Sequence, residues 1–343
     1  MTGGDTNPCM EVVYSTPSVQ AVADFVSTHF AVSGPVTCVL LRRGFNDTFE
    51  VRAKEGFRAV LRLSGRRTRG EADVATETAF LAYLDKCGIP VAAPIPTRDG
   101  NLHATVCLPE GKRPAVLFKF VEGREPDIKS PIDARAHGIA LARIHDAANG
   151  FVNGEPERYK LDLDHLLLRP TSEILKVDIL GDATRAEYAA LANRLTQQVT
   201  EIQGLTWTRC HGDCHGGNAR IAGEGPLAGR AVFFDFDDGG FGYLAYDLAV
   251  FLWARVSFGR KGTAPWHSFI DGYRSVRSIA AKDFEAVHPF VMIRHIWLLG
   301  EYAGRRHEWG NESVPAKWIA GELEFLRSWE VERVSSNLFI ERD

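Results

Sequence analysis

Hydrophobic positions near the start of the chain recur at helical spacing and then change to the short, alternating segments that are typical of strands. Thr16-Pro17 can begin the helix and Ser33-Gly34-Pro35 ends it. Turn-forming residues then separate segments that favour an antiparallel meander. A second helical pattern at 70–87 divides these segments, so the region predicts an antiparallel sheet with one helix packed on it. The predicted strands are 37–41, 49–52, 58–63, 102–108 and 115–121.

The pattern becomes mostly helical after Gly123. A long irregular connection at 151–170 interrupts it, either as a functional loop or as a variable insertion. Strict alternation of strands and helices is absent, so we expect an α+β fold and no doubly wound sheet. The boundary near Val121 gives an N-terminal lobe at 1–121 and a C-terminal, mostly helical lobe at 122–343. The predicted helices of the second lobe are 133–148, 182–203, 243–256, 266–278, 283–305 and 314–331.

Length and composition narrow the possible classes of protein. The 343 residues, 45% of them apolar, exceed the size at which one hydrophobic core stops growing, so two lobes are expected. A net charge of −4 argues against nucleic acid as a partner. No apolar stretch approaches the roughly 18 to 20 residues that cross a bilayer, which argues against a membrane protein. The six cysteines are too dispersed for a disulfide framework and no secretory pattern is present, so we expect a cytoplasmic protein.

The candidate chemistry is concentrated in two short segments, 210–218 and 232–238. Asp213 stands five residues before Asn218, and Asp235 follows an apolar, strand-like run. Phosphoryl transfer from ATP needs one aspartate to accept a hydroxyl proton, while an asparagine and a second aspartate hold Mg²⁺ against the phosphates. The separation of Asp213 from Asn218 matches the Asp-to-Asn spacing of the protein-kinase catalytic loop. The pattern therefore predicts an ATP- and Mg²⁺-dependent kinase that acts on the hydroxyl of a small molecule.

Two other interpretations of the same segments are less favoured. Cys210, His211, Cys214 and His215 are all zinc-binding residue types, but adjacent Cys-His pairs do not easily point at one tetrahedral ion. The chain also offers no second Cys-x-x-Cys element. Asp213 and Asn218 alone are compatible with ordinary turn hydrogen bonds. The Asp235 segment is what makes the phosphotransferase interpretation stronger than the turn.

At these residues the chain resembles the aminoglycoside phosphotransferase and choline kinase family. The segment around 291–310 is most similar to the homoserine-kinase-like and stress-response-kinase-like members of that family. The family's catalytic segment runs His-Gly-Asp-x-His-x-Gly-Asn, which stands here at 211–218, and its Asp-Phe-Asp segment stands at 235–237. The resemblance implies a bilobal, protein-kinase-like fold. It also implies that Asp213 is the catalytic base and that Asn218 and Asp235 bind magnesium.

The same resemblance gives supporting roles to residues around the catalytic segment. His211 and His215 would shape the loop, and Asp247, on an apolar helix, would brace it. A carboxylate buried there must accept backbone or histidine hydrogen bonds, because leaving it unpaired costs several kcal/mol. Asp237 and Asp238 either contribute to the field around metal and substrate or form a solvated acidic turn.

Nucleotide binding is expected in the N-terminal lobe, since the chain has neither a P-loop nor a dinucleotide-binding glycine motif. Arg62 stands where the family has a phosphate-binding lysine at the end of the third strand. Arginine keeps the positive charge, but its planar fork differs from a compact ammonium. Glu77 matches the helix glutamate that pairs with this cation. A surface arginine and a solvated glutamate are the alternatives.

Two further places are expected to contact the nucleotide. The turn at 44–48 occupies the position of a phosphate-covering loop, where Asn46, Asp47 and Thr48 could present backbone N–H groups or a hydroxyl, although a plain hairpin turn explains it equally well. The segment around Lys119 and Val121 resembles the inter-lobe connection, whose backbone would bind adenine.

The acceptor is expected to be a small molecule with a hydroxyl group, such as an aminoglycoside, an amino alcohol, a homoserine-like compound or a sugar. A polar and aromatic stripe in the C-terminal lobe is a candidate wall for this acceptor, although such a stripe is more often packing and surface charge. Its members are Arg294, His295, Trp297, Glu301, Arg305, Arg306 and Trp309. A Ser/Thr protein kinase and a nucleotide-binding pseudokinase are the alternatives. The choice between ATP and GTP and the oligomeric state stay open.

Overall fold

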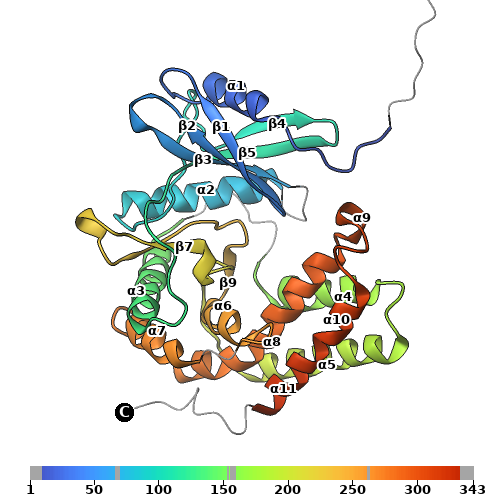
Figure 1. The fold of residues 1–343 in the computed structure, drawn as a ribbon. Helices are drawn as coiled ribbons and strands as arrows, with labels where there is room; N and C mark the ends of the chain where they lie inside the picture. Colours follow the sequence, from blue (N-terminus) through green and yellow to red (C-terminus); the bar gives the residue numbers. More distant parts are fainter. Residues whose placement is uncertain (1–9, 66–69, 153, 155–159, 261–262, 333–343) are drawn as a thin grey trace, which may run out of the picture. The chain divides into compact units, whose positions relative to one another are not determined.

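The computed structural model describes residues 10–65, 70–152, 154, 160–260 and 263–332 (Figure 1). The chain divides into two compact units, and it passes between them after Thr78, after Ala93 and after Phe120. The first unit therefore holds the N-terminal sheet. The second holds most of the helices, together with the second half of a helix that begins in the first unit.

The first unit is a five-stranded antiparallel sheet in the order β1-β2-β3-β5-β4. Helix α1 (Val19–His29) begins at Ser18, whose hydroxyl accepts a hydrogen bond from the N–H of Ala21. Helix α2 (Glu71–Lys86) follows β3 and continues into the second unit. The strands are β1 (Thr37–Arg43), β2 (Asn46–Arg52), β3 (Arg58–Ser64), β4 (Ala104–Leu108) and β5 (Gly111–Lys119).

Helix α1 packs on one face of this sheet. Its buried residues Val22 and Val26 join Phe30 in a cluster with the inward side chains of β2, β3 and β5. Because successive strand residues point to opposite faces, Leu61 and Leu63 lie in this cluster and Arg62 faces the other side. The alternation of β3 thus brings Arg62 to the face that is not covered by α1.

A buried arginine ties the hairpin of β1 and β2 to β5. Arg113 forms ion pairs with Asp47 at 3.1 Å and with Glu110 at 3.3 Å, and it donates to the carbonyls of Leu63 and Ser64. Asp47 is therefore an interior strand residue. The turn predicted at 44–48 is shorter than expected, since β2 already begins at Asn46.

The second unit combines two short antiparallel strand pairs with a set of packed helices. Strand β6 (Trp207–Cys210) pairs with β9 (Gly240–Tyr243), and β7 (Ala219–Ile221) pairs with β8 (Ala231–Phe233). The helices are α3 (Pro131–Ala148), α4 (Arg169–Leu175), α5 (Asp182–Glu201), α6 (Leu244–Val256), α7 (Ala264–Arg274), α8 (Ala281–Ala303), α9 (Arg306–Trp309), α10 (Ala316–Gly321) and α11 (Leu323–Glu332).

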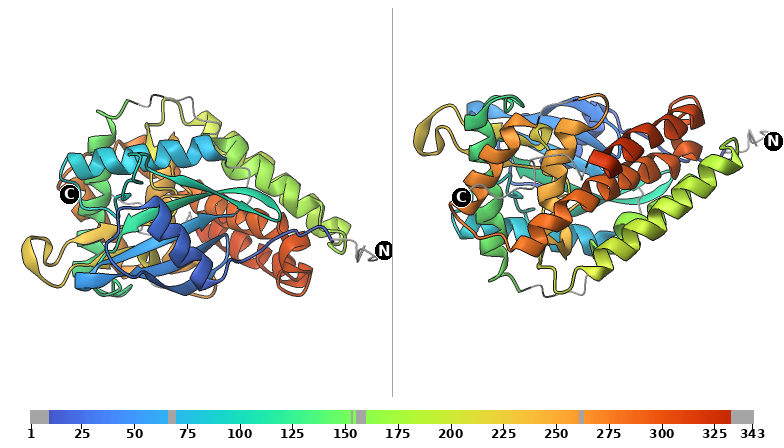
Figure 2. Two further views of the ribbon diagram at one scale, coloured as in Figure 1. Left: turned by 90° about the horizontal axis from the view of Figure 1, so that it is seen from above. Right: turned by 90° about the horizontal axis from the view of Figure 1, so that it is seen from below.

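Helices α3 and α7 approach each other through two glycines. A Cβ on Gly138 would lie 2.0 Å from the carbonyl oxygen of Phe269, and a Cβ on Gly272 would lie 2.2 Å from that of Arg135. Either side chain would force the helices apart, because interiors are close-packed. Elsewhere in this unit the long helix α5 lies beside α8 and α11 (Figure 2), and Tyr188 on α5 donates to the carbonyl of Ile319 at 2.6 Å.

Several predicted elements need correction. The single helix predicted at 314–331 is two helices, α10 and α11, which are separated after Gly321, a poor helix former. The connection predicted at 151–170 ends in regular structure, because a π-helical turn at Asp164–Leu168 runs into α4, where Pro170 occupies the first turn. None of the helices in the described part of the chain is both long enough and apolar enough for a membrane span.

Candidate active site

Asp213 lies between a buried cation and an amide. Its Oδ1 accepts a hydrogen bond from the guanidinium of Arg294, on α8, and its Oδ2 accepts one from Nδ2 of Asn218 at 2.9 Å. Nε2 of His215 lies 3.4 Å from the same Oδ2. Burial by itself raises the pKa of Asp213, but the charge of Arg294, helped by His215 and His211, outweighs burial and lowers the pKa to about 2. Asp213 is therefore an oriented carboxylate at neutral pH.

The loop that presents Asp213 is held by Asp247, in the first turn of α6. The N–H of His211 donates to Oδ2 of Asp247 at 2.6 Å, and the N–H of Gly212 donates to Oδ1 at 2.8 Å. Gly212 has a φ of +81°, and a Cβ there would lie 1.8 Å from the carbonyl oxygen of Asp238. This position therefore requires glycine.

Asp247 also receives a third donor, from a buried relay. Nε2 of His145 lies 3.0 Å from Oδ2 of Asp247, and Nδ1 of the same ring lies 2.8 Å from the hydroxyl of Tyr273. Asp247 is fully buried, so its negative charge is tolerated because these donors surround it. The structure thus places Asp247 where the sequence suggests a brace for the loop.

Both histidines of the segment bind backbone groups. In His211, Nδ1 accepts from the N–H of Asp213 at 3.2 Å and Nε2 donates to the carbonyl of Phe234 at 3.1 Å. These two bonds specify the neutral tautomer, and burial lowers the pKa of His211 accordingly. In His215, Nδ1 accepts from the N–H of Gly217 at 2.9 Å and caps a short 3₁₀ turn.

Asp235 stands two residues after the end of β8, next to a residue whose backbone binds that of Asn218. Strand β8 pairs with β7 so that Phe233 is opposite Ala219, and the N–H of Phe234 donates to the carbonyl of Asn218 at 3.1 Å. Asp235 itself is exposed and has a φ of +65°, a left-handed conformation that costs on the order of 1 kcal/mol for a residue other than glycine. Strain of this kind is concentrated at functional sites, which supports a role for this carboxylate.

The oxygen atoms at this place suit a hard divalent cation. Asn218 uses Nδ2 to bind Asp213, through both Oδ2 and the backbone carbonyl, and this leaves Oδ1 as its ligand atom. Asp235 adds a carboxylate one residue after Phe234, whose N–H donates to the carbonyl of Asn218. An amide and a carboxylate oxygen, completed by phosphate oxygens and water, form the coordination that Mg²⁺ prefers. The residues present therefore fit the predicted metal.

The zinc interpretation does not agree with this geometry. The Sγ atoms of Cys210 and Cys214 contact the backbone carbonyls of Tyr243 and Asp247 at 3.4 and 3.0 Å. Burial raises the pKa of both thiols, which disfavours the thiolates that zinc needs. Within the described ranges, the potential ligand atoms that come together are those of His145, Cys210 and Asp247, a set that omits three of the four residues proposed for zinc.

In the first unit, Arg62 and Glu77 form a buried, two-pronged ion pair. Nη1 donates to Oε1 at 2.7 Å and Nη2 donates to Oε2 at 2.6 Å. The two side chains are only 4% and 9% exposed, so neither a surface arginine nor a solvated glutamate describes them. Two parallel hydrogen bonds fix the plane of the guanidinium. Binding of a nucleotide by this pair stays a prediction.

The other residues predicted for the nucleotide lie in or beside the strands. Asn46 is the first residue of β2, and its Oδ1 accepts from the N–H of Gly65 at 3.1 Å. Thr48 lies in β2 opposite Arg62. Lys119 ends β5, and Val121 follows that strand at the start of the second unit. Their nucleotide contacts also stay predictions.

The sequence gives Arg294 only as one member of the candidate acceptor wall, whereas the structure pairs it with Asp213. It is buried against the rings of Trp253 and Trp297, with its guanidinium carbon 4.8 and 4.4 Å from their centroids. Other members of the predicted acceptor wall bind elsewhere, as Glu301 does with Arg169 and Arg305 with Glu308. The sequence signal that could have indicated this role is an arginine within an apolar helix, since a buried cation requires a partner.

Comparisons with known proteins agree on one family. The model described as "Phosphotransferase enzyme family" (APH) matches residues 37–283. An uncharacterized protein of Deinococcus radiodurans is 36% identical over 322 residues, which are 93% of this chain and 92% of that protein. A homoserine kinase of Phenylobacterium zucineum is 27% identical over 322 residues, 91% of this chain and 92% of that enzyme.

Solved structures with the same fold are also kinases. Amicoumacin kinase, in complex with AMP-PNP, Ca²⁺ and Ami, has a TM-score of 0.74 at 18% identity. The match covers 91% of this chain and 93% of the kinase chain. A microcompartment-associated aminopropanol kinase has a TM-score of 0.73 at 24% identity. The match covers 93% of this chain and 99% of that kinase. These likenesses confirm the predicted fold class, a protein-kinase-like α+β fold with an N-terminal antiparallel sheet and a mostly helical C-terminal part.

Proposed function

The chain belongs to the phosphotransferase enzyme family, as its sequence predicts, and from this premise we propose that it transfers the γ-phosphate of ATP to a hydroxyl group of a small molecule in the presence of Mg²⁺. The family and the kinase relatives make it a small-molecule phosphotransferase. The nucleotide, the metal and the acceptor are the parts that we propose here.

The observation that carries the proposal is the placement of Asp213. Arg294 and Asn218 each occupy one of its carboxylate oxygens, and the charge of Arg294 keeps it ionised. The group is thus oriented before any substrate arrives, which is what a reaction that depends on positioning requires.

Each side chain then has a defined task. Asp213 accepts the proton of the acceptor hydroxyl and aims its oxygen at the phosphorus. Asn218 and Asp235 hold Mg²⁺, which would neutralise charge on the phosphates. Arg62, aligned by Glu77, binds phosphate oxygens of the nucleotide. Asp247 keeps the backbone of the catalytic loop in place and touches no substrate.

We propose an amino alcohol as the acceptor. Two of the similar proteins are named as kinases of homoserine and of aminopropanol, and both compounds combine a hydroxyl with an amine. Asp237 and Asp238 follow Asp235 and supply negative charge beside the catalytic loop, where Gly212 contacts the backbone of Asp238. A protonated amine is favoured in such a field.

The test is an ATP-consumption screen over amino alcohols, homoserine, aminoglycosides, sugars and a generic protein substrate. We expect turnover with one class of amine-bearing alcohol and no turnover of protein. Asp213→Asn is the control, and it should lower kcat by about 10²–10⁴-fold while nucleotide affinity stays nearly unchanged. Full turnover by Asp213→Asn would remove this residue from the role of base. Absence of ATP consumption over the whole panel would count against the proposed reaction.

A further inference from the structure

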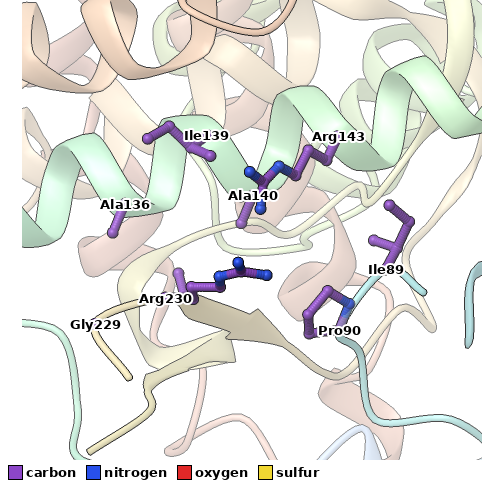
Figure 3. Close-up of a pocket in the computed structure, with 9 residues that line it drawn as sticks. Ile89, Pro90, Ala136, Ile139, Ala140, Arg143, Gly229 and Arg230 are labelled. Atoms are coloured by element: carbon purple, nitrogen blue, oxygen red, sulfur yellow. The ribbon is translucent and has the colours of Figure 1, made fainter. Parts of the chain in front are cut away.

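A pocket apart from the candidate active site lies in the second unit, on the outward face of α3. Its volume is about 180 Å³, and Figure 3 shows it between α3, the segment at Ile89 and Pro90, and the two residues that precede β8. Ala136, Ile139, Ala140 and Arg143 line it from α3, and this spacing of three or four residues defines one helix face.

This face is distinct from the one that serves the active site. His137, on the inward side of α3, donates to the carbonyl of Cys214 at 2.8 Å, and His145 binds Asp247. Both histidines are buried, whereas Ala136, Ala140 and Arg143 are partly exposed. The pocket therefore does not belong to the candidate active site.

Two arginines converge on the pocket. Figure 3 shows the guanidinium groups of Arg143 and Arg230 pointing toward one another across it. Among the residues that the structure describes, neither of them has a carboxylate partner, whereas Arg124, Arg194 and Arg327 in the same unit are paired with acids. Two facing cations without a counter-charge repel each other. An anion between them attracts both, and this attraction outweighs the repulsion.

The rest of the lining is apolar. Ile89, Pro90, Ile139 and Ala231 provide hydrocarbon surface, and the lining includes no acidic residue. A volume of about 180 Å³ is below the roughly 300 to 1,000 Å³ of pockets for drug-sized ligands, so the occupant is small. Arginine pairs suit the tetrahedral, doubly charged phosphate group in particular.

We propose that this pocket binds a small phosphate monoester with a compact apolar group, with the phosphate between Arg143 and Arg230 and the apolar group against Ile89 and Ile139. Arg143 lies on α3 and Arg230 immediately precedes β8, the strand that leads to Asp235. The ligand therefore links α3, whose His145 binds Asp247, to the strand that leads to Asp235. It raises the midpoint of thermal unfolding, because it binds the folded chain alone.

Phenyl phosphate is the probe, and calorimetry with the full chain is the measurement. Saturating AMP-PNP and Mg²⁺ are present throughout, so that nucleotide sites are occupied. We expect one phenyl phosphate per chain. Arg143→Ala and Arg230→Ala should each weaken binding by about 10-fold or more, since each removes charge-assisted hydrogen bonds to the phosphate. Lys317→Ala, which removes an exposed cation on α10, should leave the affinity unchanged.

Two further measurements, one with another protein variant and one with another ligand, test the geometry of the pocket. Ala140→Glu introduces a carboxylate on the partly exposed helix face and should abolish binding. Inorganic phosphate should bind at least several-fold more weakly than phenyl phosphate, since it lacks the apolar group. The proposal is wrong if phenyl phosphate gives no heat at millimolar concentration, if the arginine variants bind like Lys317→Ala, or if inorganic phosphate binds equally well. None of these residues belongs to the candidate active site, so this outcome leaves the proposed kinase reaction untouched.

Discussion

The guanidinium of Arg294 contacts Oδ1 of Asp213, and these two residues come from elements far apart in the chain. Arg294 is 3% exposed at its side chain and also lies within hydrogen-bond range of the hydroxyl of Tyr246, at 3.3 Å. The nearby charge of Asp213 helps to keep the pKa of Arg294 above its usual range, although burial alone would lower it. The carboxylate of Asp213 and the guanidinium of Arg294 thus stabilise each other's ionised forms.

Replacement of Arg294 by methionine should move the acid limb of kcat/KM to higher pH. Burial raises the pKa of Asp213, and the charge of Arg294 is the largest opposing influence, so removing it raises this pKa from about 2. A base with a higher pKa is protonated, and inactive, in acid. The pH dependence of kcat/KM between about pH 4 and 8 measures the shift, because it reports the free enzyme.

Arg255→Met is the matched control for this prediction. Arg255 is also a buried arginine, but it donates to the carbonyl of Phe251 on its own helix. Its removal should leave the acid limb in place. An identical shift of the acid limb in both variants would mean that a general loss of packing, rather than the charge of Arg294, changes the pKa of Asp213.

The same ion pair predicts that the folded protein loses stability in acid. Asp213 has a pKa that folding lowers from 3.8 to about 2, so its ionised form stabilises the fold above pH 3.8. This contribution is lost as the pH falls from about 4 to 2, where the carboxylate is protonated. Unfolding by denaturant at several pH values should show wild type losing more stability over this window than Asp213→Asn. Equal slopes for both proteins would contradict the lowered pKa.

Replacement of Asp235 by asparagine should weaken binding of the magnesium–nucleotide complex by at least about 10-fold, a loss of the size seen when the surroundings of a metal are disturbed. Asparagine tolerates the left-handed backbone at this position nearly as well as aspartate, so the substitution removes mainly the charge. Calorimetry with AMP-PNP and Mg²⁺ measures the affinity. Asp178→Asn, an exposed position in the same unit, should bind like wild type. Unchanged affinity in Asp235→Asn would argue against the metal assignment.

The sequence predicts most of the elements because their signals are local. The strands of the first unit and helices α3, α5, α6 and α8 lie within a few residues of the predicted positions. Periodicity reports which face of an element is buried, and this information is contained in a short window. Strands β6, β7 and β9 are only three or four residues long, too short for a period to be recognised.

Partners that meet only in the folded chain are harder to predict. Asp213, Asn218 and Asp235 stand in two short segments, so the spacing alone indicates their chemistry. Arg294 stands 81 residues after Asp213, and no local pattern distinguishes it from the other cations of its helix and the loop beyond. Its role follows from packing that brings α8 against the catalytic loop.

Replacement of Asp247 by asparagine should reduce both stability and turnover. The carboxylate accepts two backbone N–H groups and His145, and an amide can replace only part of this acceptor capacity. We expect a loss of about 2 kcal/mol of unfolding free energy and a lower kcat. Asp283→Asn is the control, because Asp283 is equally buried and binds the N–H and hydroxyl of Thr206.

The two variants separate a general loss of stability from a specific effect on the catalytic loop. Both should shift the denaturant midpoint by a similar amount, since each leaves a buried donor unsatisfied. Only Asp247→Asn should lower kcat at a temperature where both proteins stay folded. Equal kcat values for the two variants would show that Asp247 acts on stability alone.

The Arg62–Glu77 pair should contribute to nucleotide binding independently of its effect on stability. Removing one partner leaves the other charge buried, so Arg62→Met and Glu77→Leu should each cost about 3–5 kcal/mol of unfolding free energy. The double variant replaces the whole pair by apolar groups and should recover most of that loss. Its KM for ATP should nevertheless stay at least several-fold above that of wild type, since the cation that we propose as the phosphate ligand is missing. A double variant with normal stability and a normal KM for ATP would reduce the pair to a structural contact of the first unit.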